Sequence, residues 1–103
     1  MKLPRNIQKD IIKLILGRKR VEKIVIFGSR ANGNGEVTSD IDIAIFGKSW
    51  TDTDINMVKN RMEEDIKTPL KFDVLNYYGI SKGKLKENII KTGKVIYDSG
   101  KDK

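Results

Sequence analysis

Hydrophobic residues recur along the chain with two periods, one typical of helices and one typical of strands. Apolar residues three or four positions apart predict amphipathic helices over residues 4–17, 54–67 and 81–91. Shorter runs rich in β-branched and aromatic residues predict strands over residues 22–27, 39–46, 71–77 and 95–97. This order of elements indicates an α/β fold, with a small mixed β-sheet covered by helices.

The residues at the ends of these helices predict where each one starts and stops. Thr51 or Thr53 can cap the second helix, and Ser81 can cap the third, which Gly93 should end. The buried stripe of the second helix should consist of Ile55, Val58, Met62 and Ile66. That of the third should consist of Leu85, Ile89 and Ile90.

The connections between the elements predict the strand directions. Ten residues separate Ser29 from Asp40, too few for a helical crossover, so the first two strands should be antiparallel. The connection through residues 54–67 is long enough to make the second and third strands parallel. The basic run 18–20 should lie in solvent at the end of the first helix, where it favours the helix dipole, and residues 99–103 should fray.

Composition limits the chemistry that is open to this chain. Its 103 residues, 38% hydrophobic and 34% charged, predict one globular domain over residues 1–103. No apolar run approaches the roughly 20 residues of a membrane span and no signal peptide is evident, so we expect a cytoplasmic protein without a membrane partner. Because the chain has neither cysteine nor histidine, metal or acid–base chemistry must use carboxylates, which favours hard cations.

The net charge of +7 predicts attraction to anions, among them nucleotides, nucleic acids and acidic protein surfaces. The lysines are scattered along the sequence rather than clustered with aromatic residues. The scattered lysines therefore give little support for a nucleic-acid partner. A lysine-rich solvated surface is the simpler interpretation.

The candidate chemistry lies between residues 27 and 46. A predicted strand delivers Gly28 and Ser29, whose backbone N–H groups and hydroxyl can approach a phosphate, and the Arg30 guanidinium can reach a phosphate oxygen or a nearby carboxylate. In the next strand, alternation places Asp40 and Asp42 on one face and the neighbouring isoleucines on the other. Two carboxylates about 6 Å apart repel by roughly 3 kcal/mol at an effective dielectric of 20, and a divalent cation removes that cost.

A third carboxylate is available in the strand over residues 71–77, where Asp73 is the only acidic residue. If that strand lies beside the Asp40–Asp42 strand in a suitable register, the three carboxylates converge and can hold Mg²⁺ against substrate phosphates. Each residue also has a simpler interpretation. The aspartates could be solvent-facing acids, Ser29 a turn cap, and Asn76, Tyr77 and Tyr78 ordinary packing rather than a surface for a base or a partner.

The sequence resembles the nucleotidyltransferase superfamily that includes DNA polymerase beta. The resemblance rests on Gly28-Ser29, followed after ten residues by Asp40-x-Asp42, and on Asp73 in a later strand. The short chain is similar to its minimal nucleotidyltransferase branch, encoded beside HEPN-domain partners. The resemblance implies Mg²⁺-dependent transfer of AMP from ATP, with Asp40 and Asp42 as shared ligands of two metal ions and Asp73 on the catalytic ion, where it helps to activate the acceptor hydroxyl. One departure is Asn32, where many members have a basic residue.

The resemblance also implies a biological role. The acceptor would be a tyrosine of a cognate HEPN toxin, and this chain would be the antitoxin of the pair. Two alternatives stay open: a non-catalytic antitoxin that neutralises its partner by occlusion, and nucleotidyl transfer to a small molecule or an RNA end.

Overall fold

The computed structural model of the protein describes residues 4–27, 41–66, 68 and 71–101. The strands form one four-stranded sheet in the order β3-β2-β1-β4. As predicted, β1 is antiparallel to β2, and β2 is parallel to β3. Strand β1 is also antiparallel to β4. The strands are β1 (Lys23–Phe27), β2 (Ile41–Phe46), β3 (Phe72–Asn76) and β4 (Lys94–Asp98).

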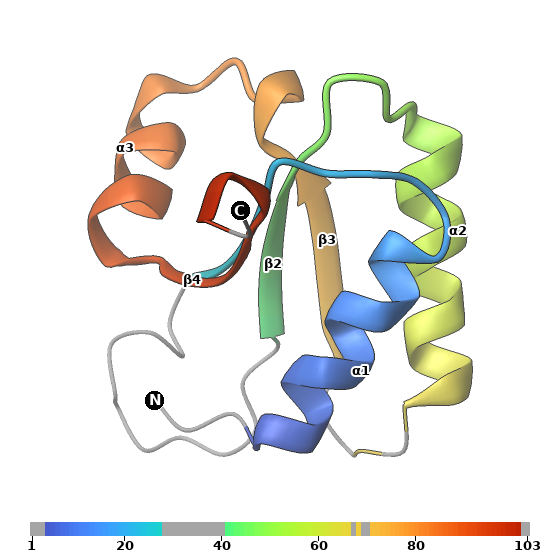
Figure 1. Cartoon of the computed structure of the whole chain (residues 1–103). Helices are drawn as coiled ribbons and strands as arrows, with labels where there is room; N and C mark the ends of the chain where they lie inside the picture. Colours follow the sequence, from blue (N-terminus) through green and yellow to red (C-terminus); the bar gives the residue numbers. More distant parts are fainter. Residues whose placement is uncertain (1–3, 28–40, 67, 69–70, 102–103) are drawn as a thin grey trace.

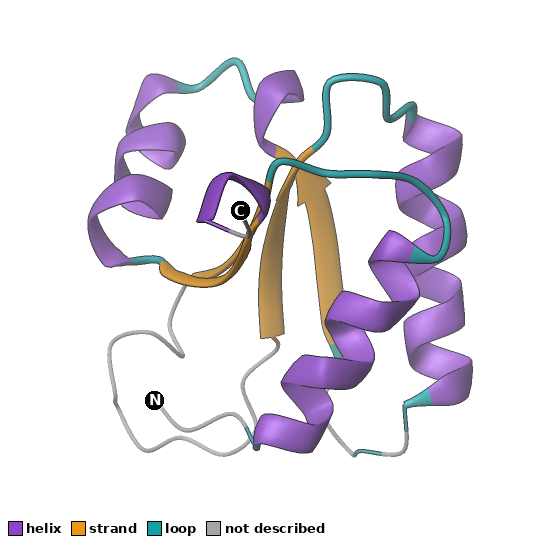
Figure 2. Ribbon diagram, viewed as in Figure 1, coloured by secondary structure: helices purple, strands orange, loops and turns teal. Residues whose placement is uncertain are grey.

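Helices cover both faces of the sheet, with α1 and α2 together on one side and α3 on the other (Figures 1 and 2). Short 3-10 helices follow β3 and β4, and the second occupies residues 99–101, part of the segment expected to fray. The helices are α1 (Arg5–Leu16), α2 (Asp52–Asp65) and α3 (Gly83–Thr92), and the 3-10 helices are η2 (Tyr77–Gly79) and η3 (Ser99–Lys101). This three-layer α/β arrangement confirms the predicted fold class. None of the helices in the described ranges is long and apolar enough to cross a membrane.

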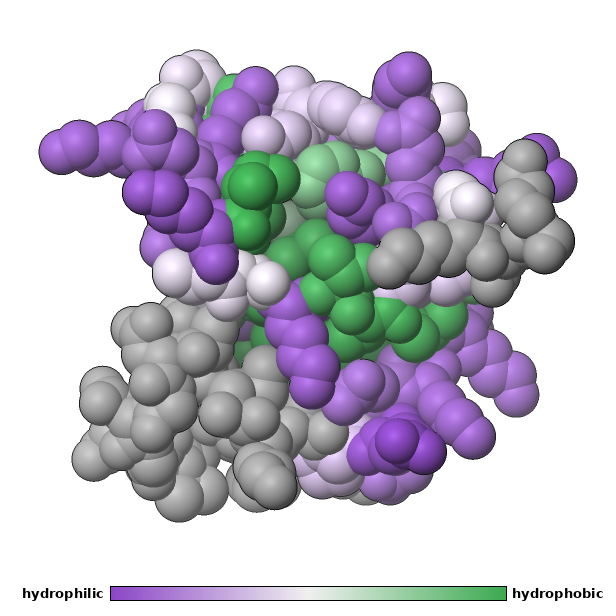
Figure 3. Space-filling view, turned by 60° about the vertical axis from the view of Figure 1, so that its left-hand side comes forward, coloured by the Kyte–Doolittle hydropathy of each residue, from purple (hydrophilic) through white to green (hydrophobic). Residues whose placement is uncertain are grey.

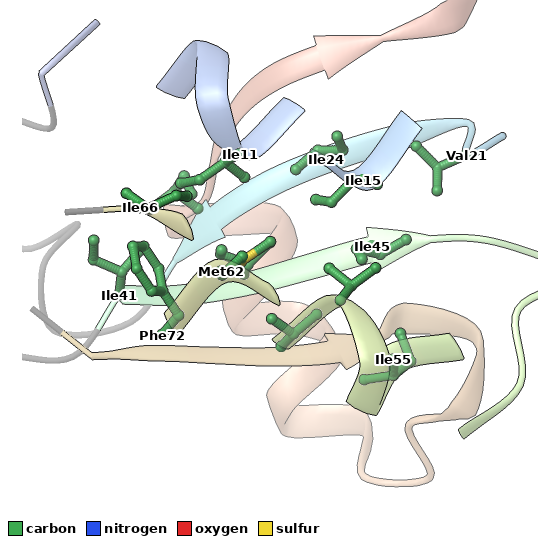
Figure 4. Close-up of a cluster of buried hydrophobic side chains, with 14 of the residues drawn as sticks. Ile11, Ile15, Val21, Ile24, Ile41, Ile45, Ile55, Met62, Ile66 and Phe72 are labelled. Atoms are coloured by element: carbon green, nitrogen blue, oxygen red, sulfur yellow. The ribbon is translucent and has the colours of Figure 1, made fainter. Parts of the chain in front are cut away.

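Two apolar clusters, one on each face, hold the layers together. The larger packs the isoleucines of β1 and β2 against α1 and α2, and includes Met62 and Phe72 (Figure 4). The smaller, between the sheet and α3, contains Val25, Phe27 and Ile89 among others. Because successive strand residues point to opposite faces, the alternation in the sequence determines which side chains join each cluster.

Helix α2 begins with a capping box that also secures α1. The Thr51 side chain accepts a hydrogen bond from the Asp54 backbone, and the Asp54 side chain accepts one from the Thr51 backbone. Asp54 is 4% exposed and also pairs with Arg18 Nε at 2.8 Å and with Lys19 Nζ at 2.7 Å. The side chains of Arg18 and Lys19 stay 35% and 39% exposed at the end of α1, but their charged groups also pair with Asp54. This ion pair was not predicted; it arises because a buried carboxylate requires cationic partners. The predicted stripe of α2 is confirmed, because its four members are buried.

Helix α3 differs from its prediction at two positions. It begins at Gly83, with Lys82 as N-cap and no side-chain cap hydrogen bond, so Ser81 is not the cap. Ile90 is 60% exposed, not inward, because Ile89 already points into the cluster and the next residue is rotated about 100° around the axis. With the α3 side turned forward, a band of hydrophobic surface appears between hydrophilic residues (Figure 3).

Gly93 closes α3 at a position where a larger residue does not fit. A Cβ atom there would overlap the carbonyl oxygen of Ile89 and the side chain of Val25. We expect Gly93→Ala to cost about 1–3 kcal/mol of the free energy of unfolding, because backbone and core must shift together. Urea unfolding of Gly93→Ala and Gly79→Ala measures this, since a Cβ at Gly79 meets nothing within 4 Å. Equal midpoints for the two variants would contradict this account.

Candidate active site

Strand β2 directs Asp42 away from the larger cluster. Its neighbours Ile41 and Ile43 are fully buried under α1 and α2, so Asp42 lies on the opposite face, which α3 partly covers. Its side chain is half-buried there. The predicted separation of isoleucines and aspartate onto two faces is thus confirmed for the described part of this strand.

The parallel pairing of β2 with β3 sets Asp42 directly beside Asp73. Neighbouring strands lie about 4.8 Å apart, and paired residues of a parallel ladder point to the same face, so both carboxylates project from one face near the start of each strand. The Asp73 side chain is 62% exposed. On the other side of Asp42, its partner in β1 is Phe27, the last residue before Gly28.

This pair of carboxylates suits a hard divalent cation. Only oxygen ligands are offered, at the surface end of an otherwise apolar strand face, and Mg²⁺ takes one or two carboxylates together with waters and substrate phosphates. Among the described residues, no group of three or more histidine, cysteine or acidic side chains could hold a metal ion. The remaining predicted residues Gly28, Ser29, Arg30 and Asp40 lie outside the described residues.

Lys59 of α2 is a charged neighbour of this pair that the sequence interpretation missed. Its Nζ atom lies 3.8 Å from Asp73 Oδ1. Lysines on helices are common at surfaces, and no local pattern around Lys59 distinguishes it from the others. Only the placement of α2 beside β3 could reveal this contact.

The aromatic residues after Asp73 serve packing at the opposite end of the sheet. Tyr77 stacks on Phe46 with ring centroids 4.2 Å apart. The side-chain amide of Asn76 donates to the Gly47 carbonyl at 2.7 Å. Tyr78 donates a hydrogen bond to Glu22, and this bond together with burial raises the pKa of Tyr78 to about 12. These contacts favour the packing interpretation for Asn76 and Tyr77, whereas Tyr78 is 42% exposed.

Comparison with known proteins identifies the family. The family model described as polymerase beta, nucleotidyltransferase matches residues 9–102. No curated protein matches the sequence. Among solved structures, a candidate nucleotidyltransferase from Sulfolobus solfataricus is 25% identical, with a TM-score of 0.59, and the match covers 93% of this chain and 81% of that chain.

Two toxin–antitoxin structures share the fold more closely. One, with AMP-PNP, has a TM-score of 0.77 at 21% identity and covers 92% of this chain and 76% of that chain. The other is a mutant MntA–HpeT toxin–antitoxin in which two aspartates two positions apart are replaced by glutamate. It has a TM-score of 0.76 at 18% identity and covers 92% of this chain and 75% of that chain. The family match over most of the sequence shows that the chain belongs to the polymerase beta nucleotidyltransferase family.

Proposed function

We propose that this chain is a Mg²⁺-dependent nucleotidyltransferase that transfers AMP from ATP to a hydroxyl acceptor. The observation that carries the proposal is the register of β2 and β3, which sets Asp42 and Asp73 side by side on one sheet face. Two adjacent carboxylates repel each other, and a divalent cation bound between them removes that repulsion. Membership of a nucleotidyltransferase family gives the pair a chemical purpose.

The proposed site combines these two residues with the segment around Gly28. Asp40, Asp42 and Asp73 hold two Mg²⁺ ions, while Gly28, Ser29 and Arg30 bind the triphosphate of ATP. Bound Mg²⁺ supplies neutralisation of phosphate charge and orientation of the reacting oxygens. A solved relative of this fold carries AMP-PNP, an ATP analogue, and in another the altered residues are two aspartates spaced like Asp40 and Asp42, which supports this assignment.

In the proposed reaction, the chain contributes position and proton transfer. Asp73 accepts the proton of the acceptor hydroxyl, whose oxygen then forms a bond to the α-phosphorus of ATP. The bond between that phosphorus and the bridging oxygen of pyrophosphate breaks, and pyrophosphate leaves with the electron pair. The exposure of Asp73 suits this role, because a large acceptor must reach its carboxylate from solvent.

For the acceptor we propose a tyrosine of a HEPN toxin, which makes this chain its antitoxin. Support comes from the fold shared with two toxin–antitoxin structures. Neutralisation by occlusion alone, and transfer to a small molecule or an RNA end, are the competing functions.

The test incubates the purified chain with ATP labelled at the α-phosphate, Mg²⁺ and the protein encoded by the neighbouring reading frame, which this proposal expects to be a HEPN protein. We expect label on a toxin tyrosine, and none with the Asp40→Asn/Asp42→Asn double variant. Asp10→Asn is the matched control, because Asp10 is an exposed aspartate of α1. A stable complex without label would favour occlusion, whereas label on RNA or a small molecule in an acceptor screen would move the activity to another substrate.

A further inference from the structure

The carboxylate of Asp73 already faces a cation from its own chain. Lys59 lies on α2, which covers the other face of the sheet, and β3 is an outer strand. The lysine side chain therefore reaches past the edge of β3 to bring its Nζ atom 3.8 Å from Asp73 Oδ1. The two residues line a surface groove, and Glu63 and Lys71 are among its other lining residues.

The contact is electrostatic and does not fix the carboxylate in one orientation. At 3.8 Å it is longer than a hydrogen bond, and the side chains of Lys59 and Asp73 are 40% and 62% exposed. The same helix contains an ordinary surface pair, Arg61 with Asp65, whose partners lie four residues apart. Lys59 also has an acid four residues further on, Glu63, yet its ion pair joins α2 to the strand that carries Asp73.

We propose that Lys59 is a counter-ion of Asp73 that weakens the binding of Mg²⁺ alone and makes tight metal binding depend on the nucleotide. The inference rests on the proposed metal site. A divalent ion at Asp73 must occupy a carboxylate that Lys59 already partly neutralises, and the ammonium group repels it. The negative charge of a bound triphosphate offsets that repulsion, so the metal and the nucleotide strengthen each other's binding.

Isothermal titration of Mg²⁺ into the full chain, with and without AMP-PNP and with a protein-free AMP-PNP titration subtracted, tests this coupling. Without nucleotide, Lys59→Gln should bind Mg²⁺ about two- to five-fold more tightly than wild type, the range expected of a solvent-exposed charge interaction. The tightening of Mg²⁺ binding by AMP-PNP should shrink by a similar factor. Lys84→Gln, an exposed lysine of α3, makes the same change in net charge and should match wild type, as should Lys59→Arg.

The outcomes separate this inference from the metal site on which it rests. Measurable Mg²⁺ binding that is equal in wild type and Lys59→Gln would overturn the role of Lys59 and leave the metal site standing. No Mg²⁺ binding by either protein, beyond the binding to free AMP-PNP, would overturn both. Binding by Lys59→Gln alone, in the absence of nucleotide, would support the inference in its strongest form.

Discussion

Replacing Asp73 with asparagine is expected to reduce nucleotidyl transfer by roughly a thousand-fold, since a metal site contributes several kcal/mol to transition-state stabilisation and each 1.4 kcal/mol is tenfold in rate. The amide keeps the shape of the side chain but loses both the negative charge and the ability to accept the acceptor's proton. Asp73 is 62% exposed, so the fold should survive. The rate of label transfer under single-turnover conditions measures the loss.

Stability must be followed in the same variant. Removing one of two adjacent carboxylates relieves their repulsion, while the exposed pair with Lys59 contributes little, so the melting temperature of Asp73→Asn should stay within a few degrees of wild type. Asp65→Asn, also an exposed acid in a surface ion pair, is the matched control and should retain full activity. If Asp73→Asn kept the activity of that control, Asp73 would have no part in the reaction.

The largest effect on stability is expected from Asp54→Asn. Asp54 is 4% exposed, and its carboxylate pairs with Arg18 and Lys19. The same carboxylate accepts the capping-box hydrogen bond at the first turn of α2. Neutralising it leaves two cations without their partner and loosens the junction of α1 with α2. The melting temperature should fall by at least about 10 °C. Thermal unfolding monitored by circular dichroism measures this.

Asp52→Asn is the control for that experiment, because Asp52 is an exposed acid in the same first turn. Its loss removes only a favourable interaction with the helix dipole and should change the melting temperature by no more than a few degrees. Similar melting temperatures for the two variants would show that the buried network around Asp54 is not what stabilises this junction.

The same network predicts how stability depends on pH. Hydrogen bonds from Lys19 and the Thr51 backbone hold the pKa of Asp54 far below its ordinary value of 3.8. The unfolded chain therefore takes up this proton first as the pH falls. The stabilisation is fully present above ~pH 5 and is lost progressively below about pH 4. Between pH 6 and pH 3 the melting temperature of wild type should fall more steeply than that of Asp54→Asn, and parallel curves would contradict this.

Much of the fold could be predicted because its signals are local. Helical periodicity placed α1 and α2, and the strand alternation of Ile41, Asp42 and Ile43 assigned the aspartate to the face opposite the larger cluster. Errors arose where a local signal competes with packing. Ser81 has a capping side chain, but α3 begins after Lys82, and Ile90 is as apolar as its buried neighbour yet lies at the surface.

By itself, the sequence determined the order of the elements, the directions of the first three strands and the face on which Asp42 lies. These depend on neighbours within a few residues and on loop lengths, which one sequence displays directly. Only the tertiary structure decided which residues meet across the fold. Asp42 and Asp73 are partners on two adjacent strands, and Lys59 reaches Asp73 past the edge of β3. Arg18 and Lys19 pair with a buried carboxylate. Each of these contacts joins residues far apart in the chain, and their alignment follows from how whole helices pack on the sheet, which no local pattern records.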